Sequence, residues 1–277
     1  MADPSAIQPI GFHLGLSGDW CIDAVSANIG DYLPASPSIG QSVTGFFSET
    51  AIHDIRNRLA LLRGEAAVEH LFRFELIDGE EPFDLTLYRS GNSYGVDAER
   101  CTDRSFGDAT GIIGGMLARI DEGDDVGLLC EQAARQMRAL TGFDQVSIWQ
   151  DGELAACSAR KPNGNPPLAP VTDDCMIVDL GAPPVEIVRE KQSGDGARHS
   201  ALRAPSQEER NWLDRSGAKA AFILPLASGG QSLGLICCQH REPYHLGVER
   251  RGIAGLFARI IALRIEVARL RTKGSSA

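Results

Sequence analysis

Apolar runs long enough to cross a lipid bilayer are missing from this sequence, since none approaches the roughly 20 residues that a spanning helix needs. The N-terminal segment Met1–Ile10 is too short and too polar to act as a signal peptide. The seven cysteines are an odd number, and no two form a C-x-x-C pair. We therefore expect neither a disulfide framework nor a metal site, no membrane contact, and a protein of the reducing cytoplasm.

Positive charge is also scarce. Lys and Arg number 27 against 37 Asp and Glu, which gives a net charge of −10. A protein that binds nucleic acid needs a basic face to neutralise phosphates, so we expect no nucleic-acid partner. Walker motifs, the glycine boxes of kinase ATP lids and Ser/His/Asp arrangements are absent from the sequence. The sequence therefore predicts no enzyme.

The first hundred residues have the pattern of a mixed α/β unit. Thr50–Arg63 carries apolar residues at spacings of three and four, which predicts an amphipathic helix that Gly64 closes. The expected strands are Phe12–Leu16, Trp20–Val25, Phe72–Ile77, Phe83–Tyr88 and Ser93–Val96. Two strands, short helices and then an antiparallel set of strands is the order of a PAS domain.

The remainder has the order helix, hairpin, loop, helix, hairpin, helix, which is that of a GAF domain. Residues 171–208 carry no clear pattern. Asp151-Gly152 is a strong hairpin signal. The expected helices are Gly111–Ile120, Val126–Thr141 and one that ends at Trp212–Gly217, and the expected strands are Gln145–Trp149, Leu154–Ala159, Ala220–Pro225 and Ser232–Gln239.

The last element, Glu249–Lys273, is predicted as a long helix with two apolar faces. One face follows a heptad pattern, and β-branched residues at position a with Leu at position d favour a parallel two-stranded coiled coil. The heptad residues are Ile253, Leu256, Ile260, Leu263, Val267 and Leu270. The alternative is that this stripe packs on the domain's own sheet. We predict that one face contacts the domain and the other face contacts a second copy of the chain.

Six segments resemble, in order, motifs of the phytochrome PAS and GAF domains. They are Ile7–Gly11 (I-Q-P-I-G, similar to I-Q-P-H-G), Ala24–Asn28 (A-V-S-A-N, similar to Q-A-S-A-N), Phe83–Gly91 (F-D-L and Y-R-S-G, similar to F-D-L and H-R-S-G), Ala139–Val146, Trp212–Ala220 and Gly234–Pro243 (G-L-I-C-C-Q-H-R-E-P, similar to L-I-A-C-H-H-x-x-P). The resemblance to bacteriophytochromes implies an α+β fold. A PAS domain (residues 1–105) would precede a GAF domain (residues 106–275) that ends in a dimerisation helix (residues 249–273). It also implies a figure-of-eight knot, in which Met1–Pro9 threads a loop of the GAF domain.

Several pigment-binding groups of the family have no counterpart here. The resemblance places a bilin-attaching cysteine about a dozen residues before I-Q-P, and none lies in Met1–Ala6. In Ala204–Arg210, where other members carry a cysteine and a histidine, Glu209 falls at the histidine position. Gln239 replaces the first histidine of the H-H pair, and His240 keeps the second. We therefore expect no covalent bilin, because no thiolate is placed to form the thioether.

Arg203 aligns with an arginine that holds a bilin propionate in the family, a role that suits a guanidinium. The alternative is a solvated surface charge. If a tetrapyrrole binds, the candidate pocket residues are Arg203, Glu209, Gln239 and His240. The adjacent Cys237 and Cys238 suggest either a redox or heme-ligating pair or two buried core residues, and we favour the core. Neighbours on a strand point to opposite faces, so these two thiols should not meet.

Together these features predict a phytochrome-like sensory protein of the cytoplasm that dimerises and regulates a separate output protein. No cofactor is expected. Two alternatives stay open. One is a small red-light photoreceptor or tetrapyrrole binder that holds biliverdin without a covalent bond, and the other is a GAF sensor of a small molecule.

Overall fold

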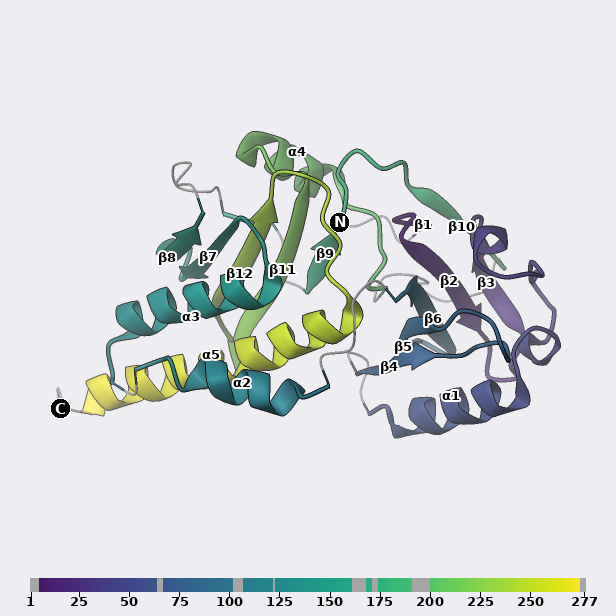
Figure 1. The fold of residues 1–277 in the computed structure, drawn as a ribbon, viewed down its shortest axis with the longest axis horizontal. Coiled ribbons are helices and arrows are strands. Elements are labelled where there is room, and N and C mark those ends of the chain that lie inside the picture. The colour runs from purple at the N-terminus through teal and green to yellow at the C-terminus, as the bar shows by residue number, and fades with distance from the viewer. Residues whose placement is uncertain are drawn as a thin grey trace. The chain divides into compact units, whose positions relative to one another are not determined.

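The computed structural model describes residues 5–63, 67–101, 107–121, 123–160, 168–170, 174–190 and 200–274. Two compact units share these residues, and each contains one antiparallel sheet (Figure 1). Unit 1 comprises Met1–Arg104 with Gly181–Gln207, and unit 2 comprises Ser105–Leu180 with Glu208–Ala277. A segment from the second half of the chain thus belongs to unit 1. This division differs from the single domain boundary between residues 105 and 106 that the sequence predicts.

Unit 1 is built on a seven-stranded sheet in the order β1-β10-β3-β2-β6-β5-β4. Its strands are β1 (Ala6–Ile7), β2 (Gly11–Leu16), β3 (Ile22–Ser26), β4 (Val68–Phe74), β5 (Phe83–Ser90), β6 (Ser93–Arg100) and β10 (Val185–Arg189). Two short 3-10 helices, Ile29–Asp31 and Val43–Gly45, and the helix α1 (Glu49–Leu61) complete the unit. The strands expected in this unit are all present, with ends shifted by a few residues.

The helix α1 begins where the sequence provides a cap. The Ser48 hydroxyl accepts a hydrogen bond from the Ala51 amide at 3.2 Å, which satisfies one free N–H of the first turn. Ile52, Ile55 and Leu59 form its buried stripe and join the apolar core on one face of the sheet. The predicted helix is therefore confirmed, although it ends at Leu61. The closing residue Gly64 lies outside the described residues.

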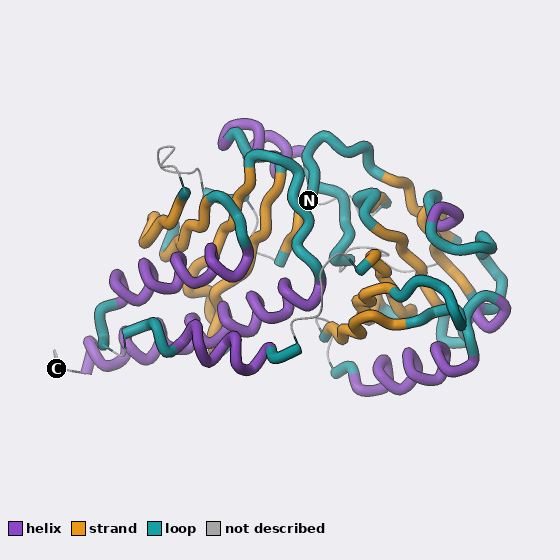
Figure 2. Tube along the Cα trace, in the orientation of Figure 1, coloured by secondary structure: helices purple, strands orange, loops and turns teal. Residues whose placement is uncertain are grey.

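The N-terminal strand β1 lies between two limbs of the segment 181–207 (Figure 2). On one side Ile7 pairs with Val185 of β10, and on the other it bridges to Arg203. The backbone N–H of Gln8 donates to the backbone carbonyl of Leu202 at 2.7 Å. Residues 191–199, which join the two limbs, lie outside the described residues, so the threaded knot stays a prediction.

Unit 2 is built on a five-stranded sheet in the order β8-β7-β12-β11-β9. Its strands are β7 (Gln145–Gln150), β8 (Glu153–Ala159), β9 (Cys175–Ile177), β11 (Ala220–Ser228) and β12 (Gln231–His240), and its helices are α2 (Ala109–Leu117), α3 (Val126–Thr141), α4 (Gln207–Ser216) and α5 (Val248–Gly274). The predicted hairpin is confirmed, since Asp151 and Gly152 both have positive φ.

The two faces of the unit 2 sheet meet different helices. The helices α3 and α5 lie side by side on one face (Figure 1), where Cys238 of β12 lies beside Thr141 of α3. Cys237 instead shares an apolar core with Trp212 and Leu213 of α4. The opposite orientation expected for the two adjacent cysteines is therefore confirmed. Within the described residues, none of the helices combines the length and hydropathy that crossing a membrane requires.

Candidate functional site

Two of the candidate pocket residues lie where α4 covers one face of the unit 2 sheet: Gln239 on the sheet and Glu209 on the helix. On β12, Gln239 follows Cys237 by two residues and therefore points to the same face. Gln239 is buried, and its Nε2 has no hydrogen-bond partner among the described residues. An unsatisfied buried donor carries a desolvation cost that is recovered only when an acceptor is present. Gln239 is therefore the part of this face best suited to meet a ligand.

Glu209 lies fully buried in the first turn of α4, where a carboxylate is favoured by the helix dipole. The Cys175 thiol of β9 donates to Glu209 Oε1 over 3.5 Å. Cys175 and Cys237 flank the same residue of β11, Ile223, in the strand register. The carboxylate of Glu209 and the apolar row of the sheet are thus parts of one buried layer.

This buried layer is packed rather than hollow. Trp212, Ile223 and Cys237 have at most 1% of their surface exposed, so atoms contact them on every side. The Trp149 Nε1 donates to the Ser147 hydroxyl at 3.1 Å. A tetrapyrrole lying against this part of the sheet would have to displace Trp149 or Trp212. The part of the layer between Trp212 and Ile223 is therefore filled by side chains.

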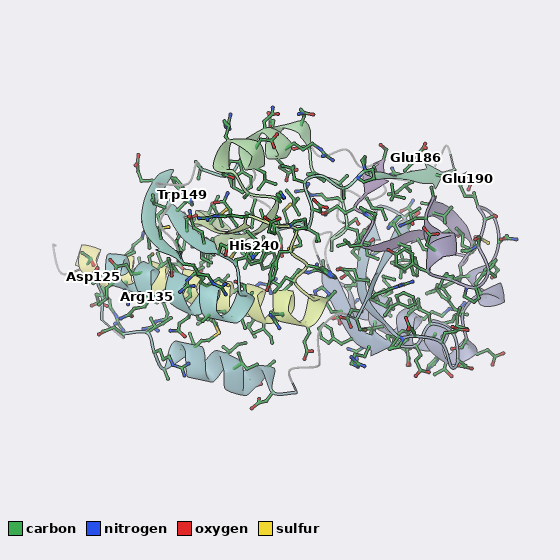
Figure 3. All side chains as sticks on the ribbon, turned by 45° about the horizontal axis from the view of Figure 1, so that its top comes forward. Asp125, Arg135, Trp149, Glu186, Glu190 and His240 are labelled. Carbon is green, nitrogen blue, oxygen red and sulfur yellow. The ribbon has the colours of Figure 1, made fainter. Side chains whose placement is uncertain are left out.

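His240 lies on the other side of β12 from Gln239, at the end of the strand (Figure 3). Its ring stacks on Tyr244, with centroids 4.7 Å apart and planes 14° apart, and its edge meets Phe143. Its Nε2 lies 3.7 Å from Asp144 Oδ2. His240 is therefore held in an aromatic cluster beside the end of α3, and the fold does not bring it onto the face that carries Gln239.

Arg203 is buried, with 9% of its surface exposed, so the surface-charge alternative for this residue is wrong. Its carbonyl accepts a hydrogen bond from Gln8 Nε2 at 3.0 Å, and its backbone bridges to Ile7. These contacts place Arg203 in unit 1, whereas Glu209, Gln239 and His240 belong to unit 2. A joint role of the four residues remains a proposal.

A buried polar cluster around Asp97 was not anticipated from the sequence. The Asp97 carboxylate accepts hydrogen bonds from the Ser200 hydroxyl at 2.7 Å and from the Ala201 amide at 2.8 Å, and its Oδ1 lies 2.8 Å from His13 Nδ1. His13 and Asp97 are both about 1% exposed. The cluster therefore ties the limb that precedes Arg203 to strands β2 and β6. Its sequence signal is weak: His13 is the one polar residue of β2, but Asp97 lies in β6 among other polar residues.

Tyr88 completes the Asp97 cluster. Its ring lies against Gly95, where an added Cβ would come within 2.2 Å of the ring carbon Cζ. Its hydroxyl lies 3.4 Å from His13 Nδ1. Burial, reinforced by the negative charge of Asp97, raises the pKa of Tyr88 well above its usual value. Tyr88 is therefore a neutral hydrogen-bonding group at physiological pH.

The chemistry of the cysteines yields a direct test of the core assignment. Burial raises the pKa of Cys237 and of Cys238 well above the usual value, and it raises the pKa of Cys130 to about 11. Alkylation requires access and the thiolate. In the native protein at about pH 8 we therefore expect these three thiols to stay unmodified, while Cys157 reacts because its side chain is exposed, although burial raises its pKa as well. Peptide mass mapping after iodoacetamide treatment measures this, with the denatured chain as control. Native labelling of Cys237 or Cys238 would favour the redox or heme-ligand alternative.

The helix α5 has one buried face and one exposed face. The buried face is formed by Ala254, Phe257, Ala258, Ile261, Ala262, Ile265 and Ala268. On the opposite side, exposure is 49% for Leu256, 54% for Leu263, 46% for Val267 and 62% for Leu270. Ile253 is buried inside the chain and Ile260 is half-buried. The inclusion of Ile253 in the interface is therefore corrected, because its side chain is already covered.

Comparison with known proteins agrees with this architecture. A family model of the GAF domain matches residues 125–265, and a model of the PAS fold matches residues 1–100. Phytochrome 1 of Selaginella martensii is 25% identical over 86% of this chain and 26% of its own length. Phytochrome B of Sorghum bicolor is 24% identical over 86% of this chain and 25% of its own length. The chain thus spans about a quarter of the curated relatives that it matches.

A solved structure matches the fold of nearly the whole chain. The chromophore-binding domain of an unusual bacteriophytochrome from R. palustris superposes with a TM-score of 0.80 and 19% identity, covering 97% of each chain. The expected order, a PAS domain followed by a GAF domain with antiparallel sheets and flanking helices, is confirmed. The GAF-domain model matches half of the residues of the chain, and the match to the PAS fold precedes it in the sequence. The chain therefore belongs to the GAF domain family and is a phytochrome-like PAS–GAF module.

Proposed function

We propose that this chain is a cytoplasmic signalling module that forms a homodimer through α5 and regulates a separate output protein, without a covalently bound bilin and without catalytic activity of its own. The coarse function, a phytochrome-like sensory module, follows from the family. The proposal adds how the signal is passed on. Association of two copies joins two sensory modules through one helix each, so a change in either module can reach the pair.

The observation that carries this proposal is the exposed stripe of α5. Four large apolar side chains, Leu256, Leu263, Val267 and Leu270, lie on one side of a helix whose other side is fully buried. Scattered exposed leucines are ordinary, but a continuous apolar row along a long helix is typical of an interaction surface. Burial of such a row against an identical row would remove all four side chains from water.

The absence of a covalent pigment is argued from the described thiols. Cys175 and Cys237 are the cysteines of the α4 face, and both are buried in its apolar core. Thioether formation requires a thiolate that the pigment can reach, and burial raises the pKa of Cys237 well above its usual value. The segment Ala204–Arg210, which includes the first turn of α4, contains no cysteine.

A second function, non-covalent binding of biliverdin or another small molecule, is favoured by Gln239. Its Nε2 is a buried donor without an acceptor in the described part of the chain. A ligand carbonyl or carboxylate at this place would satisfy the donor.

One preparation separates these functions. The chain is co-expressed with a heme oxygenase and purified, with a bacteriophytochrome chromophore-binding domain as positive control. We expect a colourless protein that has the molar mass of a dimer in light scattering. Red absorbance that survives gel filtration but is lost on denaturation would support non-covalent binding instead. Zinc-induced fluorescence of the chain on a denaturing gel would show a covalent bilin and contradict the proposal.

A further inference from the structure

We propose that Arg189 anchors a binding site for a small carboxylate, on the face of the unit 1 sheet that lies away from α1. The observation that carries this proposal is an open edge of the guanidinium group. The Nε and Nη2 atoms of Arg189 are both buried, and neither has a hydrogen-bond partner in the described part of the chain. The proposal goes beyond the signalling function and does not depend on the dimer.

The two unpaired atoms form one edge of the guanidinium. The N–H of Nε and one N–H of Nη2 point in the same direction, which is the geometry that meets both oxygens of a carboxylate. Arginine keeps its charge in proteins, so the cost of burying this edge of Arg189 without an acceptor is not relieved by loss of a proton. An oxyanion that accepts both hydrogen bonds relieves it. The open edge therefore points to a ligand of the carboxylate type.

The strand register shows what lies beside Arg189. Arg189 of β10 is paired with Ala24 of β3, Ala24 with Gly15 of β2, Gly15 with Gly95 of β6, and Gly95 with Tyr88 of β5. Direct neighbours of antiparallel strands project to the same face, so two long side chains stand at the ends of a row of small residues. Burial raises the pKa of Tyr88, and the positive charge of Arg189 opposes that shift, which places the guanidinium on the Tyr88 side of the sheet.

This row lies on the face of the sheet that α1 does not cover. The apolar core that α1 joins contains Leu14 and Leu16 of β2 and Leu87 of β5. Successive residues of a strand point to opposite faces, so Gly15 and Tyr88 belong to the other face. The site is therefore separate from the apolar core of unit 1.

The acidic side chains of this face are already engaged. Asp97 accepts two hydrogen bonds from the segment that follows residue 199. Asp23 accepts a hydrogen bond from the Ser93 hydroxyl, and its Oδ1 occupies the space where a Cβ on Gly15 would stand. Neither carboxylate accepts a hydrogen bond from the open edge of Arg189. Their negative charges disfavour a dianion here, so a singly charged carboxylate is favoured over a phosphate.

Burial limits the size of the ligand. The two atoms of the open edge have almost no exposed surface, so an acidic side chain on another protein does not meet them at the surface of unit 1. Arg189 as a whole is half-buried, which lets a small anion reach the edge through a change of rotamer. We therefore assign the site to a small molecule rather than to a protein partner.

The test uses the full chain and sodium acetate as the probe, with sodium chloride as the reference salt at constant ionic strength. In nitrogen-15 NMR spectra, the Nε–H signal that disappears in Arg189→Lys identifies Arg189. This signal should shift with a saturating dependence on acetate. Acetate should also raise the midpoint of urea unfolding, because a ligand of the native state stabilises it by mass action. Arg189→Lys keeps the charge but lacks the fork, so its apparent Kd should rise about tenfold.

Two further variants serve as controls. Arg63→Lys makes the same exchange at an exposed position of the same unit, where Arg63 donates to carbonyl oxygens at the end of α1, and its response to acetate should equal that of the original chain. Arg189→Met removes the buried charge together with the open edge. Without acetate it should unfold at the same or a higher urea concentration than the original chain, since no hydrogen bond of this edge is lost. Its response to acetate should disappear.

Saturable binding of acetate that weakens in Arg189→Lys and is absent from Arg189→Met supports the site. Equal responses of the original chain and Arg189→Met would overturn it. A chain that responds to inorganic phosphate but not to acetate would overturn the assignment to a singly charged carboxylate. Unfolding of Arg189→Met at a lower urea concentration would show that Arg189 stabilises the ligand-free chain, which also contradicts the proposal. The molar mass of the protein is not affected by any of these outcomes, so the proposed dimer is tested separately.

Discussion

The double change Leu256→Lys with Leu263→Lys is expected to convert the dimer into a monomer. The two leucines are about half exposed in the single chain, so a partner helix would bury the remaining half of each. Four leucines in the dimer then account for roughly 4 kcal/mol of apolar burial, or about a thousandfold in Kd. Four buried lysines add a desolvation cost in the same direction. Light scattering during gel filtration should show half the original molar mass.

A matched control comes from unit 1. Leu61→Lys with Val68→Lys introduces the same charges at exposed apolar positions of the other unit, at the end of α1 and on β4. This variant should keep the mass of the dimer. Unchanged mass in the Leu256 and Leu263 variant, with its helical signal in circular dichroism intact, would rule out the exposed row of α5 as the dimer contact.

Replacement of Asp97 by Asn is expected to lower the free energy of unfolding by about 2–4 kcal/mol. The Asp97 carboxylate accepts hydrogen bonds from Ser200 and Ala201 and lies beside His13. An amide carries no charge, so the hydrogen bonds that Ser200 and Ala201 donate to the Oδ2 position weaken, and the NH₂ group takes the Oδ1 position beside His13 Nδ1. The midpoint of urea unfolding should fall, and the amides of Ala201 and Leu202 should exchange hydrogen faster in mass spectrometry.

The comparison for this variant is Asp214→Asn, a change of the same chemistry at an exposed position of α4. It should stay within about 0.5 kcal/mol of the original chain, as most surface substitutions do. If Asp97→Asn unfolds and exchanges like Asp214→Asn, then the cluster does not fasten residues 200–202. If Asp97→Asn lowers the midpoint of urea unfolding but leaves the amide exchange of Ala201 and Leu202 unchanged, then Asp97 supports the stability of the whole chain and does not specifically hold residues 200–202.

Local signals made part of the fold predictable. The helix α3 was predicted with both ends correct, since Asp125 caps its first turn and Gly142, with a φ of 78°, closes its last. The orientation of Cys237 and Cys238 followed from the alternation of a strand. In each case the residues that decide the structure are neighbours in the sequence.

The parts that could not be predicted depend on residues far apart in the chain. Strands β9 and β10 have three and five residues and pair with strands that lie distant in sequence, so residues 171–208 gave no signal. The Asp97 cluster joins His13 to a residue 84 positions away. The burial of Arg203 and the loss of Ile253 from the exposed row are likewise tertiary effects. Heptad spacing identifies an apolar row but not how much of it the chain itself covers.

The place of β10 in the sheet of unit 1 has a consequence for how the protein can be divided. Because β10 pairs with β1 and β3, a chain cut at residue 105 would lose one strand from the interior of its sheet. The broken sheet would expose an unpaired edge at β3, which is a template for aggregation. It would also lack Ser200 and Ala201, the two donors to Asp97. A fragment that ends at residue 105 is therefore not expected to be stable on its own, because unit 1 also needs residues 181–207.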